Sequence, residues 1–326
     1  MKSQTFVGID VSSATLDICI RNEQIQQSFI IKNEVKEIKK FFRKYTDQQL
    51  VIAMENTGRY NWFLYEALTD LPHQVFVVAP LHIKRSMGLV RGKNDKIDAV
   101  RIALFIEKNH TELKAWKPAA PVIQKLKILL TERNARIKTK RQLLKQQHDY
   151  SKMKNLGLDK SLLKLNEKLV EQIDKQITHL ESQIAKVIES NEQLNKQAAL
   201  MQSIPGVGKV LTWTMLAKTE GFSVIDDARK MACYSGVVPF EHQSGTSIKG
   251  RHRVSPYADK SVKSILHLAA MSAIRLNNDL QQYYQRKVAE GKNKMSVLNA
   301  VRNKIIHRIF AIIKSQTPYQ NSLVLS

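Results

Sequence analysis

Four carboxylates stand where side chains from different elements of the chain can meet. Asp10 ends an alternating apolar run that predicts a strand, and Glu55 ends a second such run. Asp95 and Asp98 lie three residues apart, hence on one face of a predicted helix. Crowded carboxylates repel one another unless a cation lies among them, and their oxygens favour Mg²⁺ or Mn²⁺, which act in phosphoryl transfer. Each acid alone also fits a strand end or a solvated helix face, so it is their joint placement that predicts a metal site.

A serine in a polar loop precedes a run of basic residues. Ser244 is followed by Lys249, Arg251 and Arg253. A serine hydroxyl attacks phosphorus only when a base or metal takes its proton and cations stabilise the developing charge. The basic run could meet the second need, although a serine in such a loop more often serves a turn. Ser247 is the alternative nucleophile.

A glycine-rich turn precedes the predicted helix that starts near residue 209. Gly206 and Gly208 flank one valine, and Lys209 follows them. This pattern is typical of a helix-hairpin-helix, in which backbone N–H groups at a helix start bind phosphate without reading sequence. An ordinary turn between helices is the alternative, and the spacing is not that of an ATP-binding loop.

The net charge is the strongest feature of the composition. The 326 residues include 52 Lys and Arg against 29 Asp and Glu, a formal charge of +23. Residues 201–326 alone hold 18 basic and 7 acidic residues. Such an excess predicts a nucleic-acid partner but does not distinguish RNA from DNA.

Two cysteines, Cys19 and Cys233, lie far apart without metal-ligand spacing, which excludes a disulfide framework and predicts no zinc site. The chain shows no signal-peptide pattern and no run of 18 uncharged apolar residues. We therefore expect a cytoplasmic protein, nucleoid-associated when it acts, without a membrane span.

The first part of the chain alternates strand and helix signals. Three strand patterns in quick succession predict an antiparallel meander, and helices then alternate with two buried strands. The expected strands are 6–10, 16–20, 28–32, 50–55 and 74–79, and the expected helices are 35–45, 60–69 and 95–107. This order predicts an α/β domain over 1–118 with a mixed sheet.

Residues 119–199 favour two long helices and a coiled coil. Apolar residues recur with strict heptad spacing from Val170 to Leu194, with Asn191 at an a position. The first helix carries Arg133 and Lys140 in its seam, which indicates a partly solvated partner. An antiparallel hairpin and a parallel dimer both fit this pattern.

Residues 200–326 predict a second, helical domain. Helices are expected over 256–277, 279–290 and 294–314, with an irregular segment over 235–255. In the last helix we expect Arg302, Lys304, His307 and Arg308 on the solvent-exposed face, where they could meet nucleic acid.

Six short motifs resemble those of one family. Gly8–Ser12, Ala53–Gly58 and Lys93–Ala99 resemble the three DEDD motifs of the RuvC-like domain in the insertion sequence 110 family of transposases. The markers of that family's second, transposase domain are matched by Ile204–Lys209, Tyr234–Pro239 and Gln243–Gly245. The chain departs from the pattern at Asn94, where Thr or Ser is expected, and in offering both Ser244 and Ser247.

The resemblance implies an RNase H-like domain, a coiled coil and a helical transposase domain. It implies that Asp10, Glu55, Asp95 and Asp98 bind Mg²⁺ and that Ser244 attacks DNA to form a covalent phosphoserine link. Such a link preserves the energy of the phosphodiester bond, so no ATP is needed. The resemblance also implies double-stranded donor and target DNA, a structured bridge RNA as guide, and a homo-oligomer, dimer or tetramer.

Two other functions remain open on the residues. A RuvC-like metal-dependent junction-resolving endonuclease would use a metal-bound water, and Ser244 would be only a turn residue. A non-enzymatic architectural or RNA-binding protein would need none of the acids, so the presence of all four carboxylates argues against it.

Overall fold

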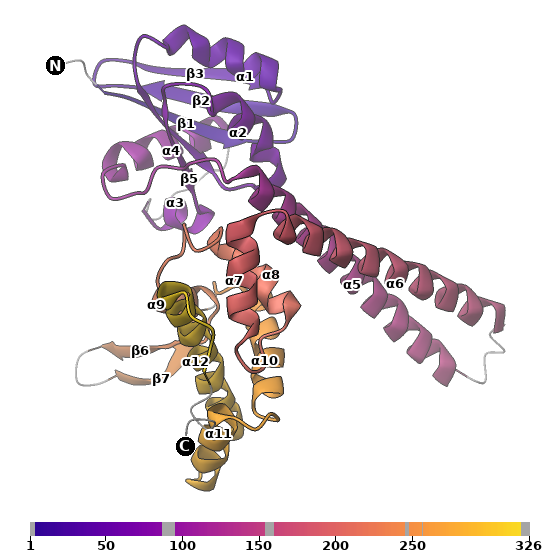
Figure 1. Ribbon diagram of the computed structural model, residues 1–326. Helices are drawn as coiled ribbons and strands as arrows, with labels where there is room; N and C mark the ends of the chain where they lie inside the picture. Colours follow the sequence, from indigo (N-terminus) through magenta and orange to yellow (C-terminus); the bar gives the residue numbers. More distant parts are fainter. Residues whose placement is uncertain (1–3, 87–94, 154–159, 245–247, 256, 321–326) are drawn as a thin grey trace. The chain divides into compact units, whose positions relative to one another are not determined.

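The computed structural model describes residues 4–86, 95–153, 160–244, 248–255 and 257–320 (Figure 1). The chain forms two compact units, residues 1–118 and 119–326. The first holds a five-stranded sheet, and the second holds the long helices and a two-stranded hairpin. Among the described residues, no helix is long and apolar enough to cross a membrane.

The sheet of the first unit has the strand order β3-β2-β1-β4-β5. Its strands are β1 Thr5–Val11, β2 Thr15–Arg21, β3 Gln26–Lys32, β4 Leu50–Glu55 and β5 Gln74–Val78. Strands β1, β2 and β3 pair antiparallel, whereas β4 runs parallel to both β1 and β5. The mixed sheet predicted from the sequence is thus confirmed, with all five strands close to their expected bounds.

Helices cover both faces of this sheet (Figure 1). Helices α1 (Val35–Phe42) and α2 (Trp62–Leu68) pack on one face with a buried cluster that includes Val7 and Ile9. Helix α4 (Asp95–Asn109) packs on the other face with Phe6, Val51 and Phe76. A short helix, α3 (Pro80–Ser86), follows β5 and was not expected from the sequence. The face that carries the even-numbered residues of β1 is therefore the one that α4 covers, and Ile83 of α3 joins the same buried cluster.

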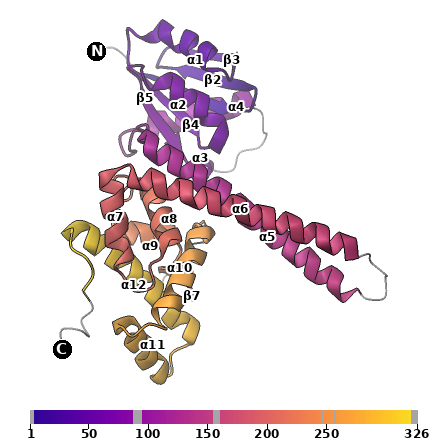
Figure 2. The ribbon, with the colours of Figure 1, turned by 45° about the vertical axis from the view of Figure 1, so that its right-hand side comes forward.

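Helices α5 (Pro121–Lys152) and α6 (Lys160–Glu189) lie side by side as an antiparallel hairpin (Figures 1 and 2). Three polar contacts join them at steps of seven residues: Arg133 to Glu181 at 2.7 Å, Lys140 to Asp174 at 2.6 Å, and Gln147 to Glu167 at 3.2 Å. The basic seam positions of α5 are therefore neutralised by α6. Of the two arrangements left open by the heptads, the hairpin within one chain is the one observed.

The heptad prediction is wrong at its C-terminal end. Helix α6 ends at Glu189, and Asn191 is the N-cap of a separate helix, α7 (Glu192–Gln202). Its Oδ1 accepts a hydrogen bond from the backbone N–H of Leu194 at 3.0 Å. Asparagine favours this role because its short side chain satisfies a donor that the first helical turn leaves free. Asn191 is thus a helix break and not a buried polar residue of a coiled coil.

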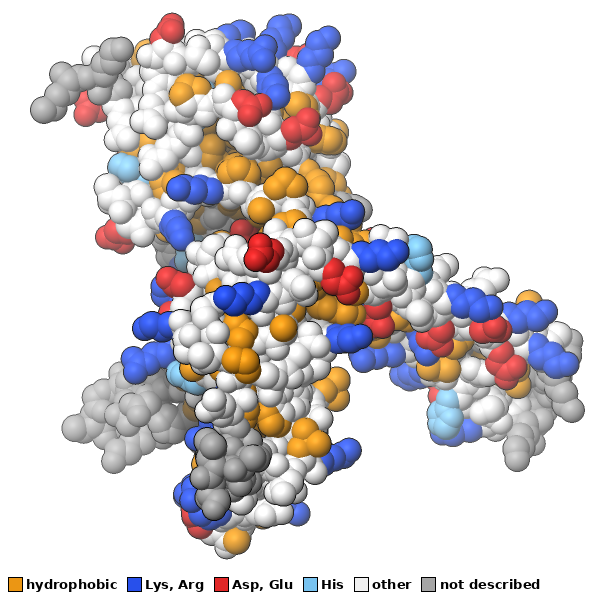
Figure 3. Space-filling view, viewed as in Figure 1, with side chains coloured by type: hydrophobic (Ala, Val, Ile, Leu, Met, Phe, Trp, Pro, Cys, Tyr) orange, Lys and Arg blue, Asp and Glu red, His pale blue; other side chains and the backbone are white. Residues whose placement is uncertain are grey.

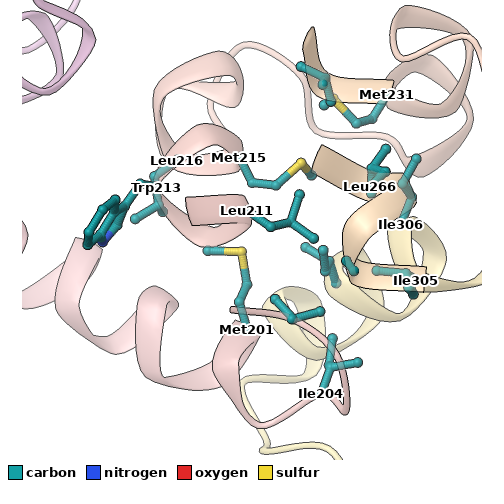
Figure 4. Close-up of a cluster of buried hydrophobic side chains, with 14 of the residues drawn as sticks. Met201, Ile204, Leu211, Trp213, Met215, Leu216, Met231, Leu266, Ile305 and Ile306 are labelled. Carbon is teal, nitrogen blue, oxygen red and sulfur yellow. The ribbon is translucent and has the colours of Figure 1, made fainter. Parts of the chain in front are cut away.

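The remaining helices surround one hydrophobic core (Figure 4). They are α8 Lys209–Thr219, α9 Ala228–Tyr234, α10 Lys260–Ala273, α11 Asp279–Ala289 and α12 Lys294–Ser315. Met201, Leu211, Leu266 and Ile305 are among the buried side chains that meet in it. The same cluster takes in Ile123, Leu126 and Ile184 from the bases of α5 and α6, so the coiled-coil hairpin and the C-terminal helices share a continuous core.

The segment expected to be irregular, 235–255, contains a β-hairpin instead. Strand β6 (Pro239–Ser244) pairs antiparallel with β7 (Ile248–Val254), with one irregularity between Phe240 and His242. Both strands are rich in polar and charged residues, so they lack the alternation of apolar and polar residues that identifies a half-buried strand.

The solvent-exposed face expected on the last helix is only partly correct: Lys304 and His307 are exposed, but the two arginines are not. Arg302 is buried, with 6% of its surface exposed, among the apolar residues of α12. Arg308 forms an ion pair with Asp279 and donates a hydrogen bond to the Tyr319 hydroxyl. Both arginines therefore belong to contacts within the unit and do not form a solvated row.

Candidate active site

Asp10 and Glu55 end neighbouring parallel strands at the same edge of the sheet. In the register of β1 and β4, Ile9 lies opposite Met54, so the two acids follow directly at the carboxyl ends. Alternation along each strand directs both toward the face covered by α4, because Val51 and Ala53 belong to the cluster on that face. Both residues are half-buried.

Gly8 lets α4 approach the sheet closely enough to complete the cluster. A Cβ atom at Gly8 would lie 2.1 Å from the carbonyl oxygen of Ala99 and 2.3 Å from the backbone nitrogen of Ala103. Only a hydrogen atom fits there, so α4 lies directly on β1. The first turn of α4 carries Asp95 and Asp98, which this contact brings to the end of β1.

The electrostatics of Asp10 reflect the crowding. Burial raises the pKa of Asp10, and the negative charges of Asp95, Asp98 and Glu55 raise it further, to about 6. The three other acids singled out in the sequence therefore act on Asp10 at this edge. A carboxyl group with such a pKa is stabilised as a carboxylate by any cation that enters the cluster.

The carboxylates are an oxygen-only donor set, which fits a hard divalent cation such as Mg²⁺. As the side chains stand in the described residues, no three Asp, Glu, His or Cys groups lie close enough to hold an ion. One reason is that Asp98 Oδ1 accepts a hydrogen bond from Arg101 Nη1 at 2.7 Å. The chemistry of the donors fits such a cation.

A fifth carboxylate, Asp17, was not found from the sequence. It lies directly opposite Asp10 in the antiparallel pair of β1 and β2, so both point to the same face. Asp17 is 8% exposed, and its pKa is raised first by burial and then by Asp95, against an opposing effect of Lys96. The short turn between β1 and β2 fixes this register, so the sequence could have predicted that Asp17 lies beside Asp10.

Two buried asparagines fix the loops beside the acids. Asn61 donates to the carbonyl of Glu55 at 2.8 Å and accepts from the backbone N–H of Thr57 at 3.1 Å. Asn33 donates to the carbonyls of Ser12 at 2.8 Å and Tyr60 at 3.1 Å. The turns that follow Asp10 and Glu55 are thereby tied together, which limits the freedom of both acids.

Ser244 is the last residue of β6 and pairs with Ile248 of β7. Lys249 lies opposite Gln243 in the ladder, and Arg253 lies opposite Phe240. The backbone of Ser244, Lys249, Arg251 and Arg253 is described, whereas their side chains are not, and Ser247 lies outside the described residues. The serine thus stands at the tip of a hairpin.

The helices before and after this hairpin are joined by a cluster of polar side chains. Lys218 Nζ lies 2.8 Å from Asp259 Oδ2, and the Tyr234 hydroxyl donates to the same carboxylate at 3.1 Å. Burial alone would raise the pKa of Asp259, but hydrogen bonds from Lys218 and Ser261 hold it well below its ordinary value. The carboxylate therefore stays ionised and joins α8, α9 and the start of α10.

The glycine-rich turn opens into a groove of about 810 Å³ in the second unit. Four exposed cations line it: Lys138, Arg141 and Lys145 from α5, and Lys209 from α8. None of them forms an ion pair with a carboxylate among the described residues. The apolar part of the lining includes Leu268, which is 66% exposed. Such a groove is suited to an extended anion.

The two glycines of the turn differ in their surroundings. Gly206 has φ +87°, and a Cβ there would lie 2.5 Å from the Ala269 carbonyl oxygen, so it allows α8 and α10 to pack. Gly208 is the N-cap of α8 without a capping side chain, and nothing lies within 4 Å of a Cβ placed on it. The space beside the backbone is therefore open at Gly208 and filled at Gly206.

Basic side chains are also spread outside the groove. On the face drawn in Figure 3, Lys and Arg side chains occur over both units and alternate with acidic ones along the α5–α6 hairpin. The positive excess on that face is therefore not gathered into a single patch.

The order of a DEDD-bearing α/β unit and a helical unit defines a class of DNA transposases. Residues 7–150 match the DEDD transposase domain of the IS110 type, and residues 198–285 match the transposase IS116/IS110/IS902 family. The chain belongs to this family, whose members are enzymes acting on DNA, and the RNase H-like fold expected for the first unit follows from that membership.

Two relatives extend the match over nearly the whole chain. The pilin gene-inverting proteins of Moraxella bovis and Moraxella lacunata are each 27% identical over 330 residues, which cover 98% of this chain and 99% of theirs. The 43.6 kDa protein of insertion element IS110 from Streptomyces coelicolor is 26% identical over 144 residues, 44% of this chain and 34% of that protein.

Proposed function

We propose that the protein is a recombinase of an insertion sequence that cuts and rejoins DNA strands through a covalent phosphoserine intermediate. The observation that carries the proposal is the meeting of Asp10, Glu55, Asp95 and Asp98 at one edge of the sheet in a chain of the transposase family. Carboxylates crowded so that the pKa of one of them is raised are typical of sites that bind a cation or transfer protons.

The four acids would hold Mg²⁺ or Mn²⁺. When bound, the cation supplies charge that stabilises the phosphate oxygens and favours the ionised form of an attacking hydroxyl. The chain itself contributes the rigid sheet edge, the close approach of α4 at Gly8, and the asparagine bonds that restrain the loops of Asp10 and Glu55. These contacts preorganise the acids before any substrate binds.

Ser244 is the proposed nucleophile. Its Oγ attacks the scissile phosphorus, the Oγ–P bond forms, the bond from phosphorus to the 3′ oxygen breaks, and the serine proton passes to solvent or to a base while the leaving oxygen is protonated. The 3′-OH of another strand then attacks the phosphoserine and releases Ser244. One phosphodiester is broken and one is made, so the sequence of steps requires no external energy source.

The acids and Ser244 belong to different compact units. An active centre that needs both is therefore assembled by closure of one chain or by two protomers that exchange parts. Such assembly would restrain cleavage until the DNA partners are in place.

The partners proposed are donor and target duplex DNA and a structured guide RNA. The groove beside Gly208 and the basic residues Lys249, Arg251 and Arg253 would contact phosphates of these polymers. The names of the Moraxella relatives describe inversion of a gene, and inversion requires the same cutting and rejoining of strands that is proposed for this chain.

Assembly into a dimer or tetramer is supported by exposed leucines near the tip of the coiled-coil hairpin. Leu162, Leu165 and Leu169 of α6 are 36%, 57% and 47% exposed and lie on neighbouring helical positions. A double variant, Leu165→Lys with Leu169→Lys, should lower the oligomeric mass measured by light scattering. An unchanged mass would assign protomer contacts to another surface.

The function is tested by trapping protein on DNA. Full-length protein, a DNA substrate carrying the element's ends, its guide RNA and Mg²⁺ are analysed on a denaturing gel for a covalent adduct. Asp10→Asn and Ser244→Ala should each abolish the adduct and recombination while retaining nucleic-acid binding, and Ser247→Ala should retain the adduct. Mixing the two inactive proteins should restore activity if protomers share the centre.

One outcome selects the other enzyme class. If Ser244→Ala protein cuts DNA at the wild-type rate and leaves a 5′-phosphate with free protein, water is the nucleophile. The chain would then be a RuvC-like junction-resolving endonuclease. Wild-type activity of Asp10→Asn in Mg²⁺ would overturn the metal site in either class.

A further inference from the structure

Arg302 on α12 is a buried cation without an anion. It is 6% exposed, and no carboxylate among the described residues lies within ion-pair distance of it. Its Nη2 lies 2.7 Å from His267 Nδ1 and its Nη1 donates to Asn299 Oδ1 at 3.3 Å, while its Nε has no hydrogen-bond partner. The guanidinium is thus held only by neutral groups.

Two more basic side chains border Arg302. Lys263 and His267 lie four residues apart on one face of α10, and both are partly exposed. Burial lowers the pKa of each, and the positive charge of Arg302 lowers it further. Because Arg302 is a donor only, the short contact requires Nδ1 of His267 to be an unprotonated acceptor.

Buried Arg133 and half-buried Arg308, in the same unit, are neutralised. Arg133, 8% exposed, bonds to Glu181 at 2.7 Å, and Arg308 pairs with Asp279. A buried guanidinium without such a partner is costly, because the lost hydration is not replaced by an opposite charge. The contrast indicates that Arg302 is arranged for an anion that the chain does not itself provide.

The cluster lies beside the segment that leads into the hairpin of Ser244. Asn299 Nδ2 donates to the carbonyl of Val237 at 2.6 Å, and a Cβ on Gly236 would lie 3.9 Å from Lys263 Cδ. Strand β6 begins two residues after Val237. At about 3.3 Å per residue, its far end is roughly 17 Å from its start.

We propose that Lys263, His267 and Arg302 form a phosphate-binding subsite for the backbone of a nucleic-acid strand that runs along the hairpin. The phosphate held there is a flanking one, because Ser244 stands at the opposite end of β6. Lys263 and the outer nitrogen of His267 reach the phosphate from the surface, and Arg302 supplies charge from beneath. The identity of the ligand as a nucleic acid rests on the proposed function, whereas the affinity for phosphate does not.

The first test uses inorganic phosphate and full-length protein without nucleic acid. Phosphate at millimolar concentration should raise the melting temperature of wild-type protein by several degrees more than that of Arg302→Gln or Lys263→Gln. Lys304→Gln is the matched control, because Lys304 is an exposed residue of the same helix that lies over the Tyr283 ring at 4.6 Å. Equal shifts in all four proteins would overturn the subsite and indicate binding to the general basic surface.

The second test measures affinity for a DNA duplex and for a structured RNA of equal charge. Lys263→Gln should weaken binding to the true ligand about tenfold and reduce the slope of log K against log salt by about 1. Loss with DNA alone or with RNA alone identifies the strand, and loss with neither overturns the proposal. Because Lys263 is partly exposed, Lys263→Gln should fold, and it tests the subsite even if Arg302→Gln does not fold.

The two proposals fail separately. A Ser244→Ala protein that still cuts DNA would overturn the phosphoserine mechanism and leave the phosphate shift intact. A wild-type covalent adduct without a phosphate-dependent shift would leave the mechanism intact and remove the subsite.

Discussion

The two units of the chain concentrate charges of opposite sign. In the first, Asp10 is crowded by three other carboxylates, and its pKa rises to about 6. In the second, buried Arg302 is bordered by Lys263 and His267 without any acid among the described residues. Each cluster is unfavourable alone, and each is relieved by a ligand, a divalent cation in one and a phosphate in the other.

In the coiled-coil hairpin, by contrast, charged side chains lie next to charges of opposite sign. Its seam pairs Arg133 with Glu181 and Lys140 with Asp174 at regular steps. The charged residues between α5 and α6 are thus paired with opposite charges within the chain. The acidic cluster around Asp10 and the basic cluster around Arg302 are not, and both belong to parts proposed to meet DNA. A phosphodiester with a bound divalent cation carries charges of both signs. The cation complements the acidic cluster, and the phosphate complements the cluster around Arg302.

The largest effect is expected from breaking the acidic cluster through the backbone. Gly8→Ala would place a Cβ 2.1 Å from the Ala99 carbonyl oxygen, so α4 must move away from β1. We expect a loss of about 3 kcal/mol or more in the free energy of unfolding of the first unit, measured by denaturant titration. Gly208→Ala is the control, because nothing lies within 4 Å of its Cβ and its φ of −96° is ordinary. A stable Gly8→Ala protein would disprove the close contact.

A second variant removes a charge that is compensated. Arg133→Met leaves Glu181 without its partner, and the side chain of Glu181 is 36% exposed. We expect a cost of about 2 kcal/mol, less than for a fully buried pair because water reaches the remaining carboxylate. Arg302→Met in the absence of phosphate should cost less than Arg133→Met, although Arg302 is the more buried residue. The reverse order in thermal unfolding would contradict the contrast between compensated and uncompensated charge.

Much of the first unit was predictable because its signals are local. The apolar runs that became β1, β4 and β5 are bounded by turn residues, and parallel strands bring their carboxyl ends together. That rule predicted that Asp10 and Glu55 lie at one edge of the sheet. The three-residue spacing of Asp95 and Asp98 predicted that both lie on one face of a helix. The role of Gly8 in bringing α4 close was not visible, because it depends on which helix crosses that point of the strand.

What was missed depends on contacts between distant segments. The hairpin of Ser244 lacks apolar alternation, so periodicity indicated an irregular loop. Asn191 continued the heptad but is equally suited to cap a helix, and local packing decided between the two roles. Arg302 has the spacing of a wet face, yet α10 covers it through His267, 35 residues earlier in the chain.

The acidic cluster also predicts a pH dependence of stability. The folded pKa of Asp10 lies above its unfolded value of about 3.9, so the proton it binds stabilises the fold. This contribution is complete below pH ~4 and is lost as pH rises through about 6. Between pH 4.5 and 7.5, roughly 1–2 kcal/mol should be lost from this group after allowance for solvent screening.

Asp10→Asn and Mg²⁺ should each remove this dependence, because one abolishes the charge and the other neutralises it. Chemical unfolding at several pH values, with Mg²⁺ and with a chelator, measures the difference. Equal pH profiles for wild-type and Asp10→Asn protein would show that the carboxylates do not crowd one another.

The smallest effect should come from the coiled-coil hairpin, where charge is already balanced near the surface. Lys140 Nζ contacts Asp174 at 2.6 Å, but the two side chains are 30% and 46% exposed. Lys140→Gln should therefore cost about 0.5 kcal/mol, and the cost should shrink in high salt. Lys175→Gln is the control, because its pair with Glu171 lies within one helix at 74% and 68% exposure and should cost still less. A cost for Lys140→Gln as large as that for Arg133→Met would mean that the contacts repeated every seven residues act together and fix the register of α5 on α6. The paired charges would then determine how the two helices pack, in addition to neutralising each other.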